Sequence, residues 1–229
     1  MPVNPKESLK LLESDVLKCD KCKDLYMCRK TSVPGTGASR ARVIFLGYIP
    51  DIDDSEEQGI PFSEKSTSDF LDFLLNEIQL NPREEVYFTY ILKCVPKKCE
   101  HKDRSKPKSL SPRLLRRDNS CELTMQPCSG EKTSPSEQEL LNCLGYLSKE
   151  ISIITPHLII PFGLNATKII LGNFLSKKIT SKNMQDYHMK VYKSPSFKVL
   201  PMHPLSWGMR RRKTYINDFR NAGRFIRLA

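Results

Sequence analysis

The sequence predicts an α/β fold of the three-layer α/β/α type, in which a four-stranded parallel sheet lies between two layers of helices. Four short apolar segments, each typical of a buried strand, cover residues 42–47, 86–92, 157–163 and 197–201. Segments with helical periodicity separate them, and strands that alternate with helices usually form one parallel sheet. Ligand sites in such folds lie at the carboxyl ends of the strands.

The helices are predicted from apolar periodicity and from start signals. They cover residues 1–16, 66–80, 134–153, 165–171 (the beginning of a helix) and 215–228. In the second segment, Ser66 and Asp69 have the spacing of a capping box. In the third, Ser134 is expected as the N-cap, with Pro135 in the first turn and Glu137 at the third position.

One basic segment interrupts this alternation. Residues 97–132 are rich in Lys, Arg, Ser and Pro, and we interpret them as a flexible insertion within a single domain that spans residues 1–229. The chain has a net charge of +11: the insertion carries +5, residues 190–229 carry +9, and the remaining residues carry −3. Focused positive charge indicates an anionic partner such as nucleic acid. With 39% hydrophobic residues, the chain is not disordered as a whole.

The eight cysteines indicate a metal centre rather than disulfides. The first helix has no signal-peptide core, and no apolar run reaches the length of a membrane span, so we expect an intracellular, reducing location and no membrane partner. Cys19 and Cys22 form a C-x2-C pair, Cys94 follows the second strand, and Cys143 lies on a predicted helix. Thiolates in this arrangement can bind one metal centre, although packed thiols without a metal have the same pattern.

Four further cysteines have no clear place in such a centre: Cys28, Cys99, Cys121 and Cys128. The last three, with His101, could bind zinc inside the insertion. Their spacing is irregular, whereas structural zinc sites favour tighter ligand pairs.

Two strand ends carry candidate functional residues. Residues 47–51 follow the first strand, an acidic stretch that includes Asp53 comes next, and Phe62 ends this region. The region is a candidate ligand cleft, or else a solvated loop. His203 follows the fourth strand, and Trp207 and a basic run at 210–213 come after it. A histidine, apolar wedges and basic residues together are typical of loops that bind phosphates and distort DNA.

These segments, in this order, resemble the uracil-DNA glycosylase superfamily, and most closely its iron–sulfur family 4. The matching segments are the C-x2-C pair, residues 33–37 (VPGTG), 42–47 (RVIFLG), 59–62 (GIPF), 86–94, Cys143, 155–163 and 200–204. The resemblance covers nearly the whole chain outside the insertion, and it implies a DNA glycosylase of base-excision repair that acts on damaged DNA as a monomer.

The resemblance also implies roles for particular residues. Four cysteines would ligate a [4Fe–4S] cluster, with zinc as the alternative occupant: Cys19, Cys22, Cys94 and Cys143. Phe62 would stack on the flipped-out base, and His203 would donate a hydrogen bond to the base oxygen where negative charge develops. The loop after His203 would bind DNA in the minor groove through four residues: Ser206, Arg210, Arg211 and Arg212.

The sequence departs from the family pattern at three positions. Tyr48 stands where the family has its catalytic glutamate, Asp51 replaces a glycine, and Tyr90 replaces the asparagine that reads uracil. Tyr48 and Tyr90 are therefore candidate base-binding residues, and Asp51 or Asp53 is a candidate substitute carboxylate. The first hypothesis is a divergent glycosylase that removes uracil or another damaged base. The second is an iron–sulfur DNA-binding protein without the chemistry, and the third is a metal-stabilised module that binds protein or RNA.

Overall fold

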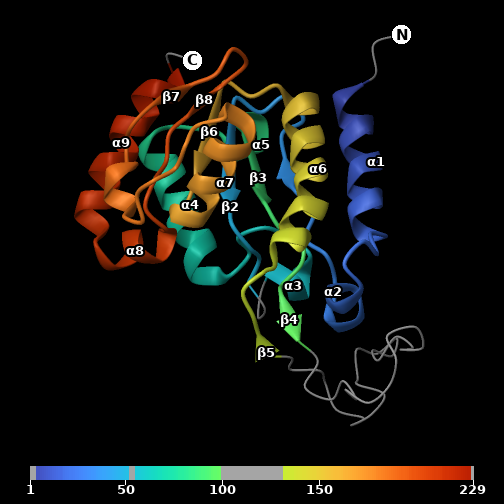
Figure 1. Cartoon of the computed structure of the whole chain (residues 1–229). Helices are drawn as coiled ribbons and strands as arrows, with labels where there is room; N and C mark the ends of the chain where they lie inside the picture. Colours follow the sequence, from blue (N-terminus) through green and yellow to red (C-terminus); the bar gives the residue numbers. More distant parts are fainter. Residues whose placement is uncertain (1–3, 52–54, 99–130, 228–229) are drawn as a thin grey trace.

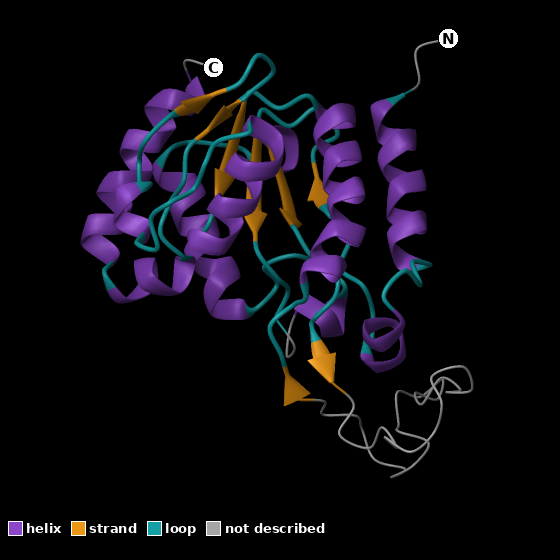
Figure 2. Ribbon diagram, in the orientation of Figure 1, coloured by secondary structure: helices purple, strands orange, loops and turns teal. Residues whose placement is uncertain are grey.

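The computed structural model describes residues 4–51, 55–98 and 131–227, and its main feature is one sheet between two helical layers (Figures 1 and 2). The predicted three-layer α/β/α fold is confirmed. The strand order is β1-β3-β2-β6-β8-β7. The strands are β1 (Thr36–Gly37), β2 (Val43–Gly47), β3 (Val86–Tyr90), β6 (Leu158–Pro161), β7 (Tyr192–Lys193) and β8 (Lys198–Val199).

The four predicted strands form the parallel centre of this sheet. β3, β2, β6 and β8 run parallel, in that order. β1 and β7 add an antiparallel strand at each edge. Each edge strand has two residues, which is too short to produce a hydrophobic pattern in the sequence.

The helices cover both faces of the sheet. They are α1 (Pro5–Leu17), α2 (Lys23–Cys28), α3 (Ser55–Gln58), α4 (Lys65–Glu77), α5 (Pro82–Glu85), α6 (Glu137–Ile154), α7 (Leu164–Leu175), α8 (Leu205–Arg210) and α9 (Arg212–Arg227), with a 3-10 turn at Met184–Asp186. α4, α8 and α9 lie on one side of the sheet, and α6 and α7 on the other, where α1 packs outside α6 (Figure 1).

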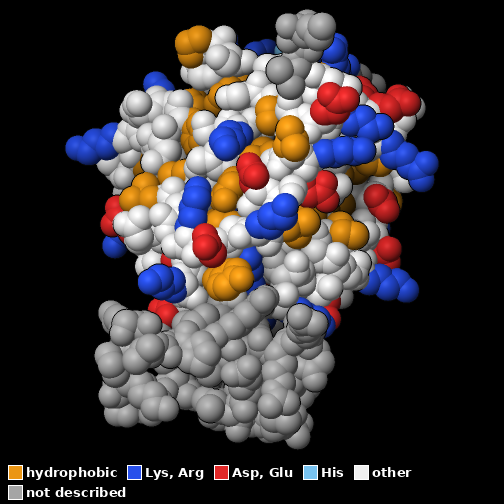
Figure 3. Space-filling model, turned by 90° about the vertical axis from the view of Figure 1, so that its right-hand side faces the viewer, with side chains coloured by type: hydrophobic (Ala, Val, Ile, Leu, Met, Phe, Trp, Pro, Cys, Tyr) orange, Lys and Arg blue, Asp and Glu red, His pale blue; other side chains and the backbone are white. Residues whose placement is uncertain are grey.

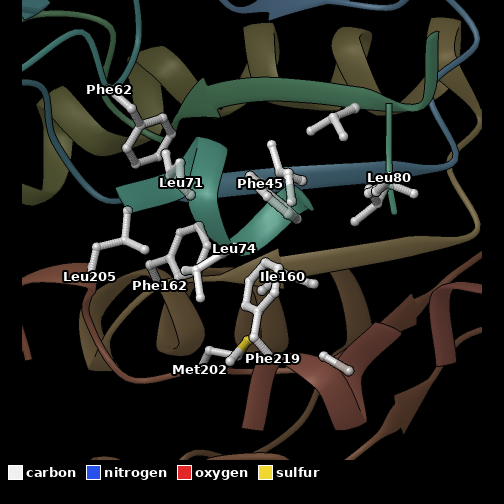
Figure 4. Close-up of a cluster of buried hydrophobic side chains, with 14 of the residues drawn as sticks. Phe45, Phe62, Leu71, Leu74, Leu80, Ile160, Phe162, Met202, Leu205 and Phe219 are labelled. Carbon is white, nitrogen blue, oxygen red and sulfur yellow. The ribbon is translucent and has the colours of Figure 1, made fainter. Parts of the chain in front are cut away.

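Alternating residues of the central strands belong to two separate hydrophobic cores, one on each face of the sheet. In β2, Phe45 belongs to the core under α4 and α9, whereas Ile44 belongs to the core under α6 and α7. All five residues of β2 are buried, which explains why this strand is apolar without alternation. Figure 4 shows the first core, with Phe62 at one end of it and Phe219 from α9 further along.

Two predicted helix caps were wrong. The N-cap of α4 is Glu64, whose carboxylate accepts backbone hydrogen bonds from residues 66 and 67, so Ser66 lies in the first turn instead of capping it. The N-cap of α6 is Ser136, which forms a capping box with Glu139, and Ser134 lies outside the helix. In both cases another capping residue stands two positions away in the sequence, and the helix begins there.

The two ends of the basic insertion meet in a short hairpin. β4 (Lys97–Lys98) pairs with β5 (Glu131–Lys132) in antiparallel register. The chain between them, residues 99–130, lies outside the described residues. The possible zinc site of Cys99, His101, Cys121 and Cys128 therefore lies outside them as well.

The outer face of α1 carries charges of both signs. In the view of Figure 3, Lys and Arg side chains alternate with Asp and Glu, and neither sign dominates this side of the molecule. Among the described helices, none combines the length and the apolar character that crossing a membrane requires.

Candidate functional site

The predicted base-binding residues and His203 lie at the carboxyl ends of the parallel strands. Gly47 at the end of β2 is the register partner of Tyr90 at the end of β3. Beyond β6 and β8, Phe162 and Met202 form one more parallel bridge. Phe162 contacts the ring of Phe62, so the regions around Phe62 and around residue 203 lie at the same edge of the sheet.

Phe62 and Tyr90 are brought into direct contact. Their ring centroids are 4.7 Å apart and the planes are tilted by 32°. The backbone N–H of Phe62 donates a hydrogen bond of 3.1 Å to the Tyr90 hydroxyl. Phe62 has a positive φ of 56°, a strained conformation for a bulky residue. Two predicted base-binding residues therefore form one packed pair.

Gly47 makes room for this pair. A Cβ atom at residue 47 would lie 2.4 Å from the Tyr90 ring and 3.0 Å from that of Phe62. The glycine at the end of β2 is therefore required by close packing, and not by a turn conformation.

His203 is buried, with a fixed orientation and tautomer. Its Nε2 atom lies 3.1 Å from Oε1 of Gln185 and donates to it, because an amide oxygen can only accept. Its ring stacks on that of Trp207 at 4.1 Å and contacts that of His188 at 4.3 Å. The Tyr215 hydroxyl donates to the His203 carbonyl over 2.7 Å. The imidazole therefore has an N–H donor whose present acceptor, the Gln185 amide, can be replaced by the oxygen of a ligand.

A second histidine, His188, accepts a hydrogen bond from the backbone of His203. The N–H of His203 donates to Nδ1 of His188 at 3.2 Å, so the other nitrogen of His188 carries hydrogen and donates to Asp218 at 3.0 Å. No motif in the sequence predicts a role for His188, Gln185 or Asp218. Only the folded chain brings them to residue 203.

The pKa of His203 is lowered. Burial is the main cause, and the neighbouring His188 lowers the pKa further, while Asp218 acts in the opposite direction. His203 is therefore held as a neutral hydrogen-bond donor.

The candidate carboxylate and the first tyrosine are placed differently. The Asp51 side chain is half exposed and lies 3.6 Å from Nζ of Lys132. The pKa of Tyr90 is raised mainly by burial, and the nearby charge of Asp51 raises it further. Tyr48 packs on the core under α6 and α7, whereas Phe62 and Tyr90 belong to the core on the other face. The structure therefore brings Asp51 near the pair, but not the ring of Tyr48. Asp53 lies outside the described residues.

Three of the four predicted ligand cysteines lie in one cluster, and the fourth lies beside it. Cys94 and Cys143 are buried in this cluster, and Cys22 packs against them. Cys19 packs against the neighbouring cluster of α1 and α6 side chains, and is near enough to raise the pKa of Cys94. Burial raises the pKa of Cys94 to about 12, with smaller contributions from neighbouring Cys143 and Cys19. All four are free thiols.

Two hydrogen-bond donors surround these sulfur atoms. Arg29, itself buried, donates to Sγ of Cys94 over 3.3 Å and to the carbonyl of Leu17 over 3.3 Å. Asn142 donates to Sγ of Cys22 over 3.4 Å. Donors of this kind surround metal-bound thiolates.

The spacing of the thiols bears on what they can hold. Among residues 4–51, 55–98 and 131–227, no three His, Cys, Asp or Glu side chains form a group tight enough to hold one metal ion. A tetrahedral zinc ion needs its sulfur ligands about 3.8 Å apart, because each Zn–S bond is about 2.3 Å. In a four-iron cluster each thiolate binds a different iron, so the sulfur atoms are further apart. Four thiols are a donor set that both a zinc ion and a four-iron cluster use.

The basic run spans the junction between α8 and α9. Ser206 and Arg210 are exposed on α8, Arg211 is its exposed C-cap, and Arg212 is exposed at the start of α9. The Arg212 guanidinium packs 4.4 Å from the Phe73 ring centre. Within the described part of the chain, none of the three arginines forms an ion pair, so their charges remain available to an anionic ligand.

The fold and this edge of the sheet define an α/β protein with a packed aromatic pair and a buried histidine at the carboxyl ends of its parallel strands. The model of the uracil DNA glycosylase superfamily matches residues 34–222. The chain belongs to this superfamily, and the predicted resemblance is confirmed.

Three curated relatives are similar to the chain, and each is named a Type-4 uracil-DNA glycosylase. The protein from Saccharolobus solfataricus is 32% identical over 77% of this chain and 62% of its own length. The relative from Sulfurisphaera tokodaii is 28% identical over 93% of this chain and 83% of its own length. The relative from Archaeoglobus fulgidus is 27% identical over 95% of this chain and 92% of its own length. The match to the first relative spans less than two thirds of that protein. Because all three relatives carry the Type-4 name, the expected resemblance to family 4 is confirmed.

Proposed function

We propose that the chain is a DNA N-glycosylase of base-excision repair that removes uracil or another damaged base from DNA. The observation that carries the proposal is the geometry of His203. A neutral, buried imidazole at the ligand-binding edge of the sheet donates its Nε2 hydrogen to a side chain that a substrate oxygen can replace. The names of the relatives support the same activity.

The reaction uses this donor at the leaving base. A glycosylase must first extrude the nucleotide, because the glycosidic bond is inaccessible inside the stack. The bond between the base nitrogen and the sugar then breaks, and its electron pair leaves with the base. His203 stabilises the charge on the base oxygen without giving up its proton. Water adds to the sugar carbon, and Asp51 is the candidate carboxylate that orients this water and takes its proton.

We also propose that four cysteines hold a [4Fe–4S] cluster: Cys19, Cys22, Cys94 and Cys143. Such a cluster would supply a structural cross-link between the end of α1, the end of β3 and α6. The chain's own contribution is the buried pocket of thiols and the N–H donors of Arg29 and Asn142.

DNA is the proposed partner, and the exposed arginines are its proposed contacts. The three arginines lie at the junction of α8 and α9, seven to nine residues after His203 in the chain: Arg210, Arg211 and Arg212. A DNA backbone on this surface would lie beside the proposed base site, and its contacts would position the duplex without reading its sequence.

A gel assay tests the proposed activity. Oligonucleotides with a single uracil, hypoxanthine or xanthine, as single strands and duplexes, are incubated with the protein, and alkali then cleaves any abasic site. The proposal predicts cleavage with at least one of these bases. Absence of abasic product with all of them, together with retained and salt-sensitive DNA binding, would instead support the DNA-binding hypothesis.

A further inference from the structure

The ring of Phe62 meets several other aromatic rings, and one of them differs in orientation. Phe88 and Phe162 approach it edge-on, at 6.2 and 6.1 Å with interplanar angles of 65° and 81°. Tyr90 lies closer, at 4.7 Å, and is much nearer to parallel at 32°. Tyr90 therefore covers a face of Phe62, while the two phenylalanines meet it at steep angles.

Tyr90 is fixed in this position. Its hydroxyl accepts the N–H of Phe62 and lies 3.3 Å from Oγ of Ser55 on α3. Its ring packs onto Gly47, where any side chain would collide with it. Tyr90 and Phe62 are only 6% and 9% exposed. A planar ligand therefore has no free access to the covered face of Phe62.

Filling of the core alone does not account for this arrangement. An apolar side chain would fill the same space, whereas Tyr90 also holds the strained backbone of Phe62 through a hydrogen bond. Strain of this kind persists where the surroundings impose it, and it is concentrated at ligand sites. The pair also lies at the edge of the sheet where ligands bind in this class of fold.

We propose that Tyr90 is a specificity-determining gate, whose ring occupies the face of Phe62 on which a flipped-out base would stack. A base is accepted only after Tyr90 leaves that face. This inference rests on the proposed glycosylase function for its ligand, an extruded nucleobase. The site then favours bases whose stacking and hydrogen bonding outweigh the contacts that Tyr90 makes, and it discriminates against all others.

Two variants separate the ring from its anchor. Tyr90→Ala removes both, and we expect its affinity for a free base to rise by at least about tenfold, which corresponds to the loss of one ring contact and two hydrogen bonds. Tyr90→Phe keeps the ring and loses only the two hydrogen bonds, so its rise is smaller, at least about fivefold. Phe88→Leu is the matched control, because it removes an aromatic neighbour of Phe62 that does not cover its face.

The experiment measures base binding and excision separately. Saturation-transfer NMR with uracil and with hypoxanthine gives the affinity of the wild type and the three variants. Single-turnover assays on DNA that contains uracil, hypoxanthine or xanthine give the excision rates. Thermal unfolding confirms that each variant is folded. The expected order of base affinity is Tyr90→Ala, then Tyr90→Phe, then the wild type and Phe88→Leu together.

The outcomes distinguish the gate from the enzyme activity. Tighter base binding by Tyr90→Ala, without excision by any variant, supports the gate and contradicts the glycosylase proposal. Excision by the wild type with equal base affinity in all variants overturns the gate and leaves the activity intact. An equal rise in Phe88→Leu also overturns the gate, since general loosening would then produce it. If Tyr90→Ala does not fold, an unchanged affinity in Tyr90→Phe overturns the gate.

Discussion

Nζ of Lys93 donates to both carboxylate oxygens of Glu150, at 2.8 Å each, and the two side chains are 2% and 1% exposed. The Thr89 hydroxyl also contacts the carboxylate, at 3.0 Å. Lys93 directly precedes Cys94, and Glu150 lies on α6, the helix of Cys143. A buried ion pair therefore joins two of the segments that carry the proposed cluster ligands.

Breaking this ion pair should destabilise the protein strongly. Glu150→Gln leaves the Lys93 charge buried without a carboxylate, and we expect the free energy of unfolding to fall by about 3–5 kcal/mol. Urea denaturation measures the change. Glu77→Gln is the control, because Glu77 pairs with Arg220 on the surface and should cost less than about 1 kcal/mol. Equal effects of the two substitutions would contradict this account.

His188 should act as a positioning residue for His203. His188→Ala removes the acceptor of the backbone N–H of His203 and the ring that packs against the His203 imidazole. We therefore expect kcat to fall about tenfold to a hundredfold with little change in KM. Single-turnover excision and DNA titration separate the two effects. His157→Ala, at an exposed position beside the amino end of β6, is the control. A larger effect on DNA affinity than on kcat would show that His188 has another role.

The lowered pKa of His203 gives a pH-dependent stability of predictable sign. The folded protein binds this proton less readily than the unfolded chain, whose histidines have a pKa of about 6.5. Stability from His203 is therefore present above pH ~6.5 and is lost as the pH falls below it towards the lowered folded pKa. Urea denaturation at pH ~6.5 and below should show that the free energy of unfolding depends less on pH in His203→Gln than in the wild type. The same slope in both proteins would contradict the assignment.

Arg29 should retain the proposed cluster. Its guanidinium joins Sγ of Cys94 to the Leu17 carbonyl near the C-x2-C pair, and the loss of such donors typically weakens metal binding tenfold or more. We expect anaerobic protein to contain iron and sulfide, and Arg29→Ala to lose iron to a chelator about tenfold faster. Visible absorbance follows the loss. Arg83→Ala, at an exposed position on α5, should behave as the wild type, and equal rates in all three proteins would rule out this role for Arg29.

The arginines after His203 should control DNA affinity without selecting sequence. Changing Arg210, Arg211 and Arg212 together to Ala should weaken binding on every sequence and reduce the salt slope by as much as about 2.7. Fluorescence anisotropy at several salt concentrations measures both. The control removes the same charge from α1 and its C-cap, through Lys6→Ala, Lys10→Ala and Lys18→Ala, and should leave the slope unchanged. The reverse result would place the interface on α1.

The layers of the fold could be predicted from the sequence, while the helix starts could not. β2 and β6 are short continuous apolar runs because both of their faces are covered, and such runs are typical of the central strands of a parallel sheet. The start of α6 was ambiguous because Ser134 and Ser136 are both acceptable caps. Only the hydrogen bonds of the folded chain select Ser136.

The site could be predicted only in part, for a similar reason. His203, Phe62 and the cysteines lie in motifs that a single sequence reveals. Gln185 and His188 reach His203 through a turn without a motif, and Asp218 reaches His188 from α9. The replacement at residue 90 is visible in the sequence, but the stacking of its ring on Phe62 is a property of the folded chain.

The most direct test of the central claim compares single-turnover excision by the wild type and by His203→Ala on DNA that contains one uracil. The account predicts abasic product from the wild type and a rate lower by about 10²–10³-fold in the variant, because a donor to the developing negative charge is lost. DNA affinity should remain within about twofold, since His203 is not among the proposed phosphate contacts. Equal rates in the two proteins, or no product from the wild type on any damaged base, would contradict the account.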